Sequence, residues 1–486
     1  MLSKQFHLSN RCLLGCLSFV LVLIGTSRTQ GGQARPEISI QSPVIALLHA
    51  KVVDGLGTAA LTDQTIVIKA GRISAIGASA AVAVPPEAKI VDLTGKTVIP
   101  GLVMVHEHLF YAVSSDIAWH GHHFTEMEYS FPRLYLACGI TTIRTAGSIE
   151  PYADLETKRR IDAGEMPGPR MHLTAPYIEG PPSVFAQFHA VSGPEEATRL
   201  VNYWADEGFT SIKLYIHVTP DVAAAAITAA HRRGLQVTGH IGVLTYTEAA
   251  DLGIDNLEHG FFPANDFVHG KKPGVMPLPT QTTQSLAALR TDSPECQALL
   301  RHLIEKHVAI TSTLPVLEGF VSGRPILSDK ILTVMSAAAR ENYYGWWGTY
   351  NGKDLAGFTP IFAKMMKLEK QFSDEGGVLV AGTDPTGIGN VVAGFGSLRE
   401  VELLVDAGFT PVQAIKVASL NGARLLGVDK DLGSIEPGKI ADLVVIDGDP
   451  ASSIQEIENV ETVFKSGVGY DSSVLIDSVR GCVGIQ

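Results

Sequence analysis

Cysteine is scarce in this sequence: the 486 residues include five. Cys12 and Cys16 lie in an apolar stretch near the N-terminus, whereas Cys138, Cys296 and Cys482 are scattered far apart. An odd number of distant cysteines cannot build a disulfide framework or a cysteine-rich zinc site. Any metal site in this protein must therefore take its ligands from other residue types.

Positive charge is also in short supply. The chain has 38 lysines and arginines against 50 aspartates and glutamates, a net charge of -12, and no run of basic residues that could follow a phosphate backbone. Nucleic-acid binding depends on such clustered positive charge, so we exclude nucleic acid as a partner. Apolar residues, in contrast, make up 45% of the chain, enough for one large core and a smaller one.

A run long enough to span a membrane is missing near the N-terminus as well. The apolar stretch at 12–26 is shorter than the roughly 20 residues that a spanning helix needs. Lys4 and Arg11 precede it and small or polar residues come after it, which is the order of a secretory signal peptide. We predict that residues 1–35 are a cleaved signal peptide, that the mature chain is secreted or periplasmic, and that no stable membrane span remains. An uncleaved anchor is the alternative.

Two segments near the ends of the chain share a pattern typical of β-structure. Short apolar runs broken by Gly and Asp fill residues 36–98, and apolar and polar residues alternate in TIVIKAGRISAI at 65–76. Such alternation predicts half-buried antiparallel strands. The same texture returns in residues 430–486. We predict that the two segments pair into one small β-sandwich domain.

The segment between them, residues 99–429, predicts a (β/α)8 barrel of the TIM type. Strand-like apolar runs alternate with helix-like stretches such as 194–208 and 219–234, which is the order of strands and crossover helices in such a barrel. Eight runs can be counted, at 97–106, 139–146, 170–178, 209–216, 235–241, 254–259, 308–313 and 376–384.

Residue types that bind metal ions recur at the ends of these runs. Functional residues of such barrels project from the carboxyl ends of the strands. His106 and His108 are two positions apart, so on an extended strand both side chains point to the same side and can share one ion. A lone histidine is usually an ordinary core or surface residue, but repetition at equivalent strand ends favours a metal site. The full set is His106, His108, Lys213, His240, His259 and Asp384.

These residues stand in motifs that resemble the amidohydrolase superfamily, and more closely its imidazolonepropionase-like and prolidase-like branch. The resemblance covers nearly the whole mature chain, with the ligand types in family order and at family spacing. The motifs are Pro100-Gly101-Leu102 leading to His106-Glu107-His108, Ile212-Lys213, Gly239-His240, Glu258-His259-Gly260, Gly382-Thr383-Asp384, Asn421-Gly422-Ala423, and LGSIEPGKIADLV at 432–444.

The resemblance implies a site with two divalent ions, most often zinc. Lys213 would bridge the ions as a carbamate, which forms when a neutral amine adds carbon dioxide. A buried lysine paired with a carboxylate is the alternative for Lys213. The implied ligands are His106, His108 and Asp384 for a buried ion, and His240 and His259 for a more exposed ion.

The implied reaction is hydrolysis of an amide or peptide-like C–N bond, in a small-molecule or peptide-like substrate of the N-acyl amino acid or dipeptide class. A water shared by two ions has a lowered pKa and supplies hydroxide near neutral pH. Asp384 would carry the proton to the leaving nitrogen. Tyr215, two positions after Lys213, either binds the substrate carbonyl or packs against the next loop.

Three positions depart from the family pattern. Met104 stands where many members have an aspartate, and Thr145 comes after Arg144 where many have Arg-Asp. Residues 174–189, TAPYIEGPPSVFAQFH, replace a Gly-Gly-His-Gly type segment in a region that recognises substrate. The substrate therefore does not transfer to this chain by analogy.

Other functions remain open. A mononuclear deaminase or a cyclic-amide hydrolase could use the same barrel, but single-metal deaminases generally lack a residue like Lys213. The same hydroxide could also attack a lactone or a phosphoester. A catalytically inactive binding protein would be expected to have lost ligands, and all six are present. The sequence leaves the oligomeric state open, a homo-oligomer included.

Overall fold

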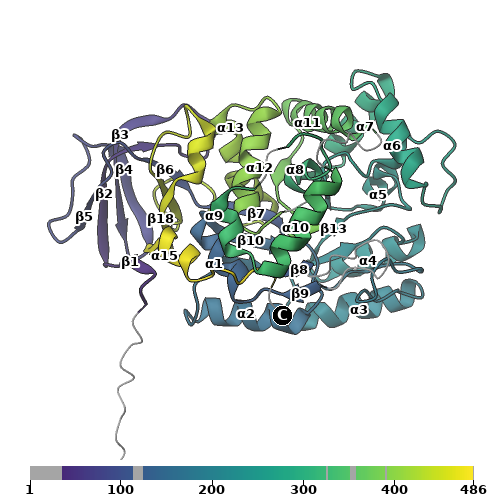
Figure 1. Ribbon diagram of the computed structural model, residues 1–486, viewed down its shortest axis with the longest axis horizontal. Coiled ribbons are helices and arrows are strands. Elements are labelled where there is room, and N and C mark those ends of the chain that lie inside the picture. The colour runs from purple at the N-terminus through teal and green to yellow at the C-terminus, as the bar shows by residue number, and fades with distance from the viewer. Residues whose placement is uncertain (1–34, 113–123, 325–326, 351–356, 389–390, 485–486) are drawn as a thin grey trace, which may run out of the picture. The chain divides into compact units, whose positions relative to one another are not determined.

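The computed structural model describes residues 35–112, 124–324, 327–350, 357–388 and 391–484 (Figure 1). All but the last residue of the predicted signal peptide, 1–35, lies outside these ranges, so the signal peptide stays a prediction. Among the described helices, none has the length together with the hydrophobicity that a membrane crossing requires.

The two β-rich end segments share one nine-stranded sheet. Its strand order is β1-β19-β18-β17-β6-β2-β3-β4, with β5 paired to β2. β6 and β17 join the segments as an antiparallel pair in which Val98 lies opposite Val445. The strands are β1 (Ile38–Ile40), β2 (Val44–Val52), β3 (Leu61–Lys69), β4 (Arg72–Ala78), β5 (Lys89–Asp92), β6 (Thr97–Pro100), β17 (Leu443–Ile446), β18 (Val460–Lys465) and β19 (Val468–Asp471).

Alternating apolar residues of this sheet form their own core. Ile66, Ile68, Val98, Val445 and Phe464 are buried together there, from strands of both segments. Neither segment could bury its apolar face alone, so the ends of the chain depend on each other for this domain.

The central part of the described chain is an eight-stranded parallel barrel, and each predicted apolar run overlaps one of its strands. The pairs β7–β10–β11 and β12–β13–β14–β15–β16 form two arcs. Parallel bridges from Thr174 to Ser211 and from Ile178 to Leu214 join the arcs. The strands are β7 (Leu102–Glu107), β10 (Ile140–Thr145), β11 (Arg170–His172), β12 (Ser211–Leu214), β13 (Gln236–Gly239), β14 (Asn256–Leu257), β15 (Ala309–Ser312) and β16 (Leu379–Ala381).

Backbone hydrogen bonds close the barrel between its first and last strands. The amides of Thr383 and Asp384 donate to the carbonyl oxygen of His106, over 3.0 and 3.1 Å. The carboxyl ends of β7 and β16 therefore meet, as a barrel requires.

Helices come after most of the barrel strands (Figure 1). Several begin with a proline, which fixes φ and lacks an N–H that would need a partner in the first turn. The main helices are α1 (Ser130–Ala137), α2 (Pro151–Asp162), α3 (Pro194–Asp206), α4 (Pro220–Arg232), α5 (Tyr246–Leu252), α6 (Pro279–Ala288), α7 (Pro294–Glu305), α10 (Ala337–Tyr350), α11 (Phe358–Asp374) and α12 (Phe395–Asp406).

Short elements complete the described chain. A hairpin of two short strands, β8 and β9, lies between β7 and α1. The remaining elements are β8 (Phe110–Ala112), β9 (Phe124–Glu126), η1 (Asn265–Phe267), α8 (Leu314–Glu318), α9 (Asp329–Val334), α13 (Pro411–Lys416), the π-helix η4 (Val417–Asn421), α14 (Gly422–Leu425), η5 (Ile454–Glu458) and α15 (Ser472–Asp477).

The C-terminal segment also contacts the barrel. The hydroxyl of Ser472 in α15 donates to the carbonyl oxygen of Ala137 in α1 over 2.7 Å. Leu475 and Ile476 are buried in the same core as the barrel strands. The described part of the C-terminal segment, residues 430–484, therefore contributes both to the small sheet and to the packing around the barrel.

Candidate metal centre

The first two predicted ligands lie at the carboxyl end of β7. His106 and His108 are each 1% exposed. The Nδ1 of His106 lies 2.7 Å from Oε2 of Glu258, and the Nδ1 of His108 lies 3.2 Å from the carbonyl oxygen of Gly147. With Nδ1 engaged, each ring keeps its Nε2 for another contact, which is how ligand histidines are held in metalloproteins.

Asp384 faces both rings from the loop after β16. Its Oδ1 lies 3.5 Å from Nε2 of His106 and 3.2 Å from Nε2 of His108. The preceding Gly382 explains why this loop can come so close: a Cβ there would lie 2.3 Å from the Cβ of His106. Asp384 itself adopts a left-handed φ of 58°. Close packing where the barrel closes therefore explains why the Gly-Thr-Asp motif begins with a glycine.

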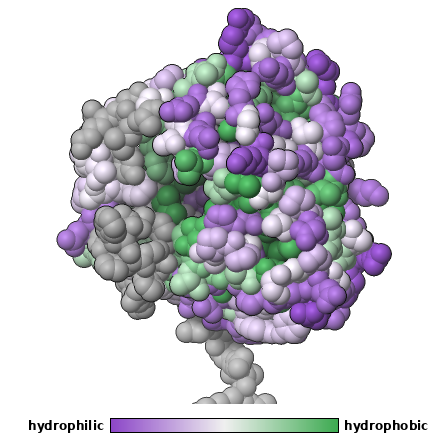
Figure 2. Space-filling model, turned by 90° about the vertical axis from the view of Figure 1, so that its right-hand side faces the viewer, coloured by the Kyte–Doolittle hydropathy of each residue, from purple (hydrophilic) through white to green (hydrophobic). Residues whose placement is uncertain are grey.

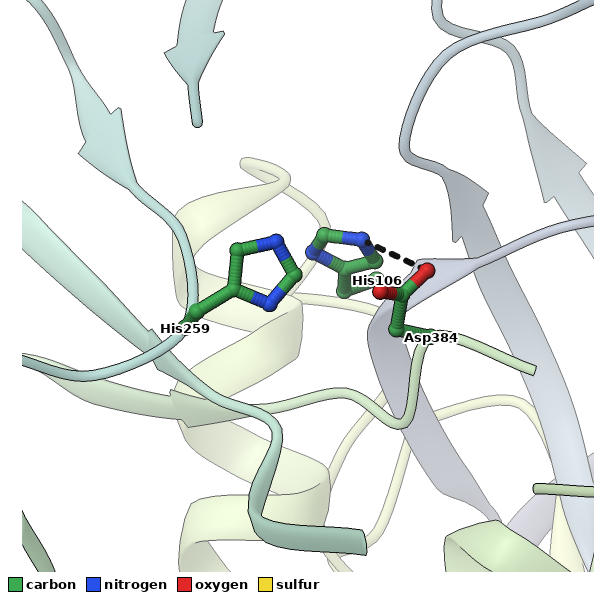
Figure 3. A group of neighbouring side chains, drawn as sticks. All are labelled: His106, His259 and Asp384. Carbon is green, nitrogen blue, oxygen red and sulfur yellow. Dashed lines mark ion pairs between the residues drawn. The ribbon is translucent and has the colours of Figure 1, made fainter. Parts of the chain in front are cut away.

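His259 lies between the other histidines. Its ring centroid is 4.7 Å from that of His106 and 4.4 Å from that of His240, and its Nδ1 lies 2.8 Å from Oγ1 of Thr313. Figure 3 shows His259, His106 and Asp384 converging from three different strand ends. Ligand atoms of these three residues lie within 4.8 Å of one another. Imidazole nitrogens and a carboxylate oxygen at this spacing suit a divalent ion such as zinc.

Lys213 lies in β12 among these groups. Its side chain is 1% exposed, and Nζ has no hydrogen-bond partner among the residues that the structure describes. The nearest carboxylate oxygen paired with it, Oε1 of Glu258, is 3.8 Å away. Burial lowers the pKa of the Lys213 amine to about 8. The alternative interpretation, a buried lysine paired with a carboxylate, is thus met by an ion pair with Glu258, although Nζ makes no hydrogen bond to the described residues.

Glu258 is a functional residue that sequence reasoning missed. It is fully buried and accepts hydrogen bonds from His106, from the Arg144 guanidinium over 2.9 Å, and from the Thr238 hydroxyl. Burial would raise its pKa, but Lys213, His106 and Arg144 hold that pKa well below the usual range. The signal that could have found it was its place in the Glu-His-Gly motif beside His259.

Arg144 stands out in the sequence only because Thr145, not aspartate, comes after it. The arginine is 1% exposed, and besides Glu258 it donates to the carbonyl oxygen of Val105 over 2.8 Å and to Oδ1 of Asn256 over 2.6 Å. Val105 immediately precedes His106. Arg144 therefore fixes both the strand that carries His106 and the carboxylate that orients its ring.

Two of the departures from the family pattern are accounted for by packing. Met104 is fully buried in the barrel core. The Oγ1 of Thr145 accepts the backbone amide of Thr174 over 2.9 Å, which ties β10 to the segment after β11. Neither residue faces the ligands in the described contacts, so both changes alter the scaffold rather than the ligand set.

The third departure, residues 174–189, supplies an aromatic wall beside the ligands. Tyr177 and Phe188 stack with ring centroids 4.0 Å apart, and both contact Tyr215 at 5.1 and 5.2 Å. The ring of Tyr215 lies 5.3 Å from His240. Figure 2 shows apolar side chains inside a hollow on one face of the molecule. The structure thus brings Tyr215 to the ligand group, with aromatic rings around it.

Glu179 links the two loops that carry the residues of this wall. The carboxylate is fully buried, and its Oε1 accepts the backbone amides of Gly180 and His217 over 2.7 and 2.8 Å. Burial raises the pKa of Glu179 to about 7. This carboxyl therefore joins the loop after β11 to the loop after β12, which carries Tyr215.

Solved structures share this architecture, and two of them serve as examples. A presumed prolidase from Bifidobacterium longum is 26% identical, with the alignment covering 90% of this chain and 98% of that one at a TM-score of 0.62. A Xaa-Pro dipeptidase with methionine bound in its active site is 21% identical over 88% of this chain and 100% of that one, at a TM-score of 0.65. The second likeness concerns the fold alone.

Curated relatives match over short segments. A 5-methylthioadenosine/S-adenosylhomocysteine deaminase from Thermoanaerobacter pseudethanolicus is 37% identical over 108 residues, 21% of this chain and 23% of that one. An imidazolonepropionase from Picrophilus torridus is 61% identical over 36 residues, 7% of this chain and 9% of that one. The matches to deaminases cover 11 to 23% of the length of those relatives. Similarity is therefore local in sequence and extended in structure.

A family model covers far more of the chain. The model for the amidohydrolase family matches residues 97–468, from β6 to the start of β19. That range contains all the predicted ligands and the whole barrel. The predicted resemblance and the predicted fold class, a barrel with a small β domain, are confirmed, and the chain belongs to the amidohydrolase family of metal-dependent hydrolases acting on C–N bonds.

Proposed function

We propose that this protein hydrolyses an amide or peptide-like C–N bond, of the N-acyl amino acid or dipeptide class, with two divalent ions and a carbamate on Lys213. The observation that carries the proposal is the buried Nζ of Lys213, which has no hydrogen-bond partner among the described residues and lies among the predicted ligands. A buried amine that makes no hydrogen bond is costly unless a group in the working enzyme satisfies it. The likeness to the presumed prolidase supports the substrate class.

The donor set fits two ions, and its imidazole and carboxylate groups favour zinc. When bound, the ions supply a Lewis acid and a water of lowered pKa. Glu258 and Gly147 hold the rings of His106 and His108 so that each Nε2 faces Asp384, on the side where an ion would bind. Lys213, once carboxylated, would offer one oxygen to each side of the site. The remaining ligands are His240, His259 and Asp384.

Asp384 is the ligand best placed to move a proton. Its side chain is 18% exposed, whereas those of His106 and His108 are 2% and 1% exposed. It can therefore meet a substrate while its Oδ1 stays beside the two rings. In the proposed reaction this carboxylate accepts a proton and delivers it to the leaving nitrogen.

Tyr215 is the proposed contact to the substrate carbonyl. Its hydroxyl has no hydrogen bond to any residue that the structure describes, and its ring is held by Tyr177 and Phe188 beside His240. A donor held in a fixed place near the reacting carbonyl stabilises the negative charge that develops on oxygen.

The test compares Lys213 with a second, largely buried lysine. Metal analysis of wild-type protein should find about two divalent ions per chain. Lys213→Ala should lose activity and much of the metal, and acetate or propionate in the buffer should restore part of both, because a short carboxylate can replace the carbamate. Lys213→Arg should not be rescued, since guanidinium stays cationic.

Lys465→Ala is the matched control. Lys465 donates to the carbonyl oxygen of Gly168 over 2.7 Å, far from the ligands in the chain, so its loss should leave metal content unchanged. If Lys213→Ala kept wild-type turnover and metal content, the proposed carbamate bridge on Lys213 would be wrong. The substrate class needs a separate screen of N-acyl amino acids, dipeptides, lactones and cyclic ureides with the same preparation.

A mononuclear deaminase or cyclic-amide hydrolase is the second candidate. The local matches to deaminases favour it, as does the single close group of His106, His259 and Asp384 among the described residues. This function requires one ion per chain and full activity with it. It would also leave Lys213→Ala active.

We propose further that the protein acts outside the cytoplasm. The support is the order of charged, apolar and polar residues before residue 36. N-terminal sequencing of exported protein should find a first residue between about Ser27 and Pro36. Recovery of the intact N-terminus in membranes would contradict cleavage.

A further inference from the structure

A second group of buried oxygens lies close to the residues that hold His108. Glu126 ends β9, Ser148 comes after β10, and Asp154 lies in the first turn of α2. Four oxygens, Oε1 and Oε2 of Glu126, Oγ of Ser148 and Oδ1 of Asp154, are buried without a hydrogen-bond partner among the described residues. Ser148 and Asp154 are each 2% exposed. So many orphaned oxygens in one place point to a bound group that satisfies them.

The charges that act most strongly on these oxygens all have one sign. Burial raises the pKa of Glu126, and the charges of Asp154, Glu128 and Glu150 raise it further, although the backbone amide of Glu150 opposes the rise. Burial likewise raises the pKa of Asp154 to about 7, with Glu150 adding to the effect and the facing hydroxyl of Ser148 opposing it. The charged groups that act most strongly on the two carboxyls are all carboxylates. The strongest electrostatic influences on the cluster are therefore negative.

We propose that Glu126, Asp154 and Ser148 form a binding site for a hard divalent cation of the calcium class, separate from the catalytic ions. All the available donors are oxygens, which calcium prefers, and neither histidine nor cysteine is among them to favour zinc. Glu126 has both carboxylate oxygens free and can bind through the pair. Asp154 and Ser148 add one oxygen each, and water fills the remaining positions.

Two exposed carboxylates give the surface near the site a negative charge. Glu128 and Glu150 are exposed, and both act on the carboxylate of Glu126. Exposed carboxylates beside a partly enclosed pair raise the local concentration of cations.

Such an ion would join the two segments on either side of His108. Glu126 lies opposite Phe110 in the β8–β9 ladder, and the ring of Phe110 lies 4.4 Å from that of His108. Ser148 comes directly after Gly147, whose carbonyl oxygen contacts His108. The bound cation would thus stabilise the surroundings of His108 while taking no part in the reaction.

The test uses the full chain with its catalytic metals in place, in calcium-free buffer. Equilibrium dialysis against radioactive calcium should find one bound ion per chain, with a dissociation constant of about 0.1 to 1 mM. Calcium at about 10 mM should raise the Tm by about 2 to 5 °C, because it binds the folded state alone. Magnesium chloride serves as the comparison ion.

Three variants assign the binding to this cluster. Asp154→Asn and Ser148→Ala should each weaken calcium binding by about tenfold or more, since each removes a ligand. Both substitutions are small and leave the fold intact. Glu156→Gln is the matched control, because Glu156 lies on the same helix but is exposed and paired with Arg159 over 2.8 Å. It should bind calcium like the wild type.

The proposal is overturned if the wild type takes up no calcium, if magnesium binds more tightly, or if Asp154→Asn binds calcium as well as the wild type. It is also overturned if Asp154→Asn raises the Tm without calcium while calcium leaves the wild-type Tm unchanged. That last result would mean that Glu126 and Asp154 share a proton instead of a cation.

Discussion

The two sides of the candidate site are built in opposite ways. On the ligand side, the Nδ1 atoms of His106, His108 and His259 are each fixed by a partner, namely Glu258, the Gly147 carbonyl and Thr313. On the substrate side, Tyr177 and Tyr215 are held by ring packing, and their hydroxyls have no hydrogen bonds to described residues.

This difference separates what sets the reaction from what selects the substrate. Fixed hydrogen bonds orient ligands to within a narrow range and are sensitive to a single lost charge. Aromatic packing holds shape and tolerates changes that preserve volume. Changes on the ligand side should therefore abolish function, and changes on the substrate side should alter it by degrees.

Glu258→Gln should have the largest effect. The amide has nearly the same shape, but it leaves the buried Arg144 guanidinium without its negative partner and no longer anchors His106. Removing one partner of a buried ion pair costs about 3 to 5 kcal/mol. We expect a lower urea midpoint, loss of bound metal and no measurable turnover, with Glu156→Gln as the control. Wild-type metal content in Glu258→Gln would show that the ligand side does not depend on this charge.

Tyr215→Phe should have the next largest effect, and it tests the substrate side. The ring and its packing remain, so the Tm should not change. If the hydroxyl contacts the substrate carbonyl, kcat should fall by about 100-fold with little change in KM. Steady-state kinetics with the best substrate from the screen would measure both constants. An unchanged kcat would assign Tyr215 to packing alone.

Phe188→Leu should produce a smaller change on the same side. It removes the stack with Tyr177 but keeps an apolar side chain, so KM should rise by about tenfold while kcat changes little. Tyr152→Leu is a suitable control, because Tyr152 is 55% exposed on α2 and lies outside the wall. A fall in kcat without a rise in KM would contradict the assignment of Phe188 to substrate selection.

The smallest effect on turnover is expected from Glu369, a buried carboxyl in α11 that has no cation beside it among the described residues. Its Oε2 accepts the Ser312 hydroxyl over 2.6 Å, and burial raises its pKa to about 8 from 4.5. Because the folded pKa is raised, unfolded chains ionise first, and this carboxyl lowers stability as pH rises from about 4.5 to 8. Glu369→Gln should flatten that decline, measured as urea midpoints at several pH values. If the urea midpoints of the wild type and Glu369→Gln changed with pH in the same way, Glu369 would not be a neutral carboxyl in the folded protein.

The candidate ligands could be grouped from the sequence because each lies in a local motif at or near the end of a strand-like run. The eight runs reveal the barrel, and barrel geometry brings His106, His240, His259 and Asp384 to one end. The small sheet was predictable for a similar reason, since alternation at 65–76 carries its own signal.

The rest depended on neighbours that are distant in sequence. Arg144 and Glu258 form an ion pair across 114 positions, and nothing in either local pattern indicates it. The aromatic wall at 174–189 could not be predicted because loops lack the hydrophobic periodicity of helices and strands. Packing against Tyr215 fixes the positions of these residues instead. Glu126 and Asp154 likewise come from different elements.

The closure of the barrel has a consequence for how the protein is made. Thr383 donates to the carboxylate of Glu107 across 276 positions, in the same place where Asp384 meets His106 and His108. The first ligands are synthesised long before the last, and contacts between distant residues form late because loop closure must precede them. Metal uptake would then report that the last strand has docked, and an ion bound at full affinity would mark a finished barrel.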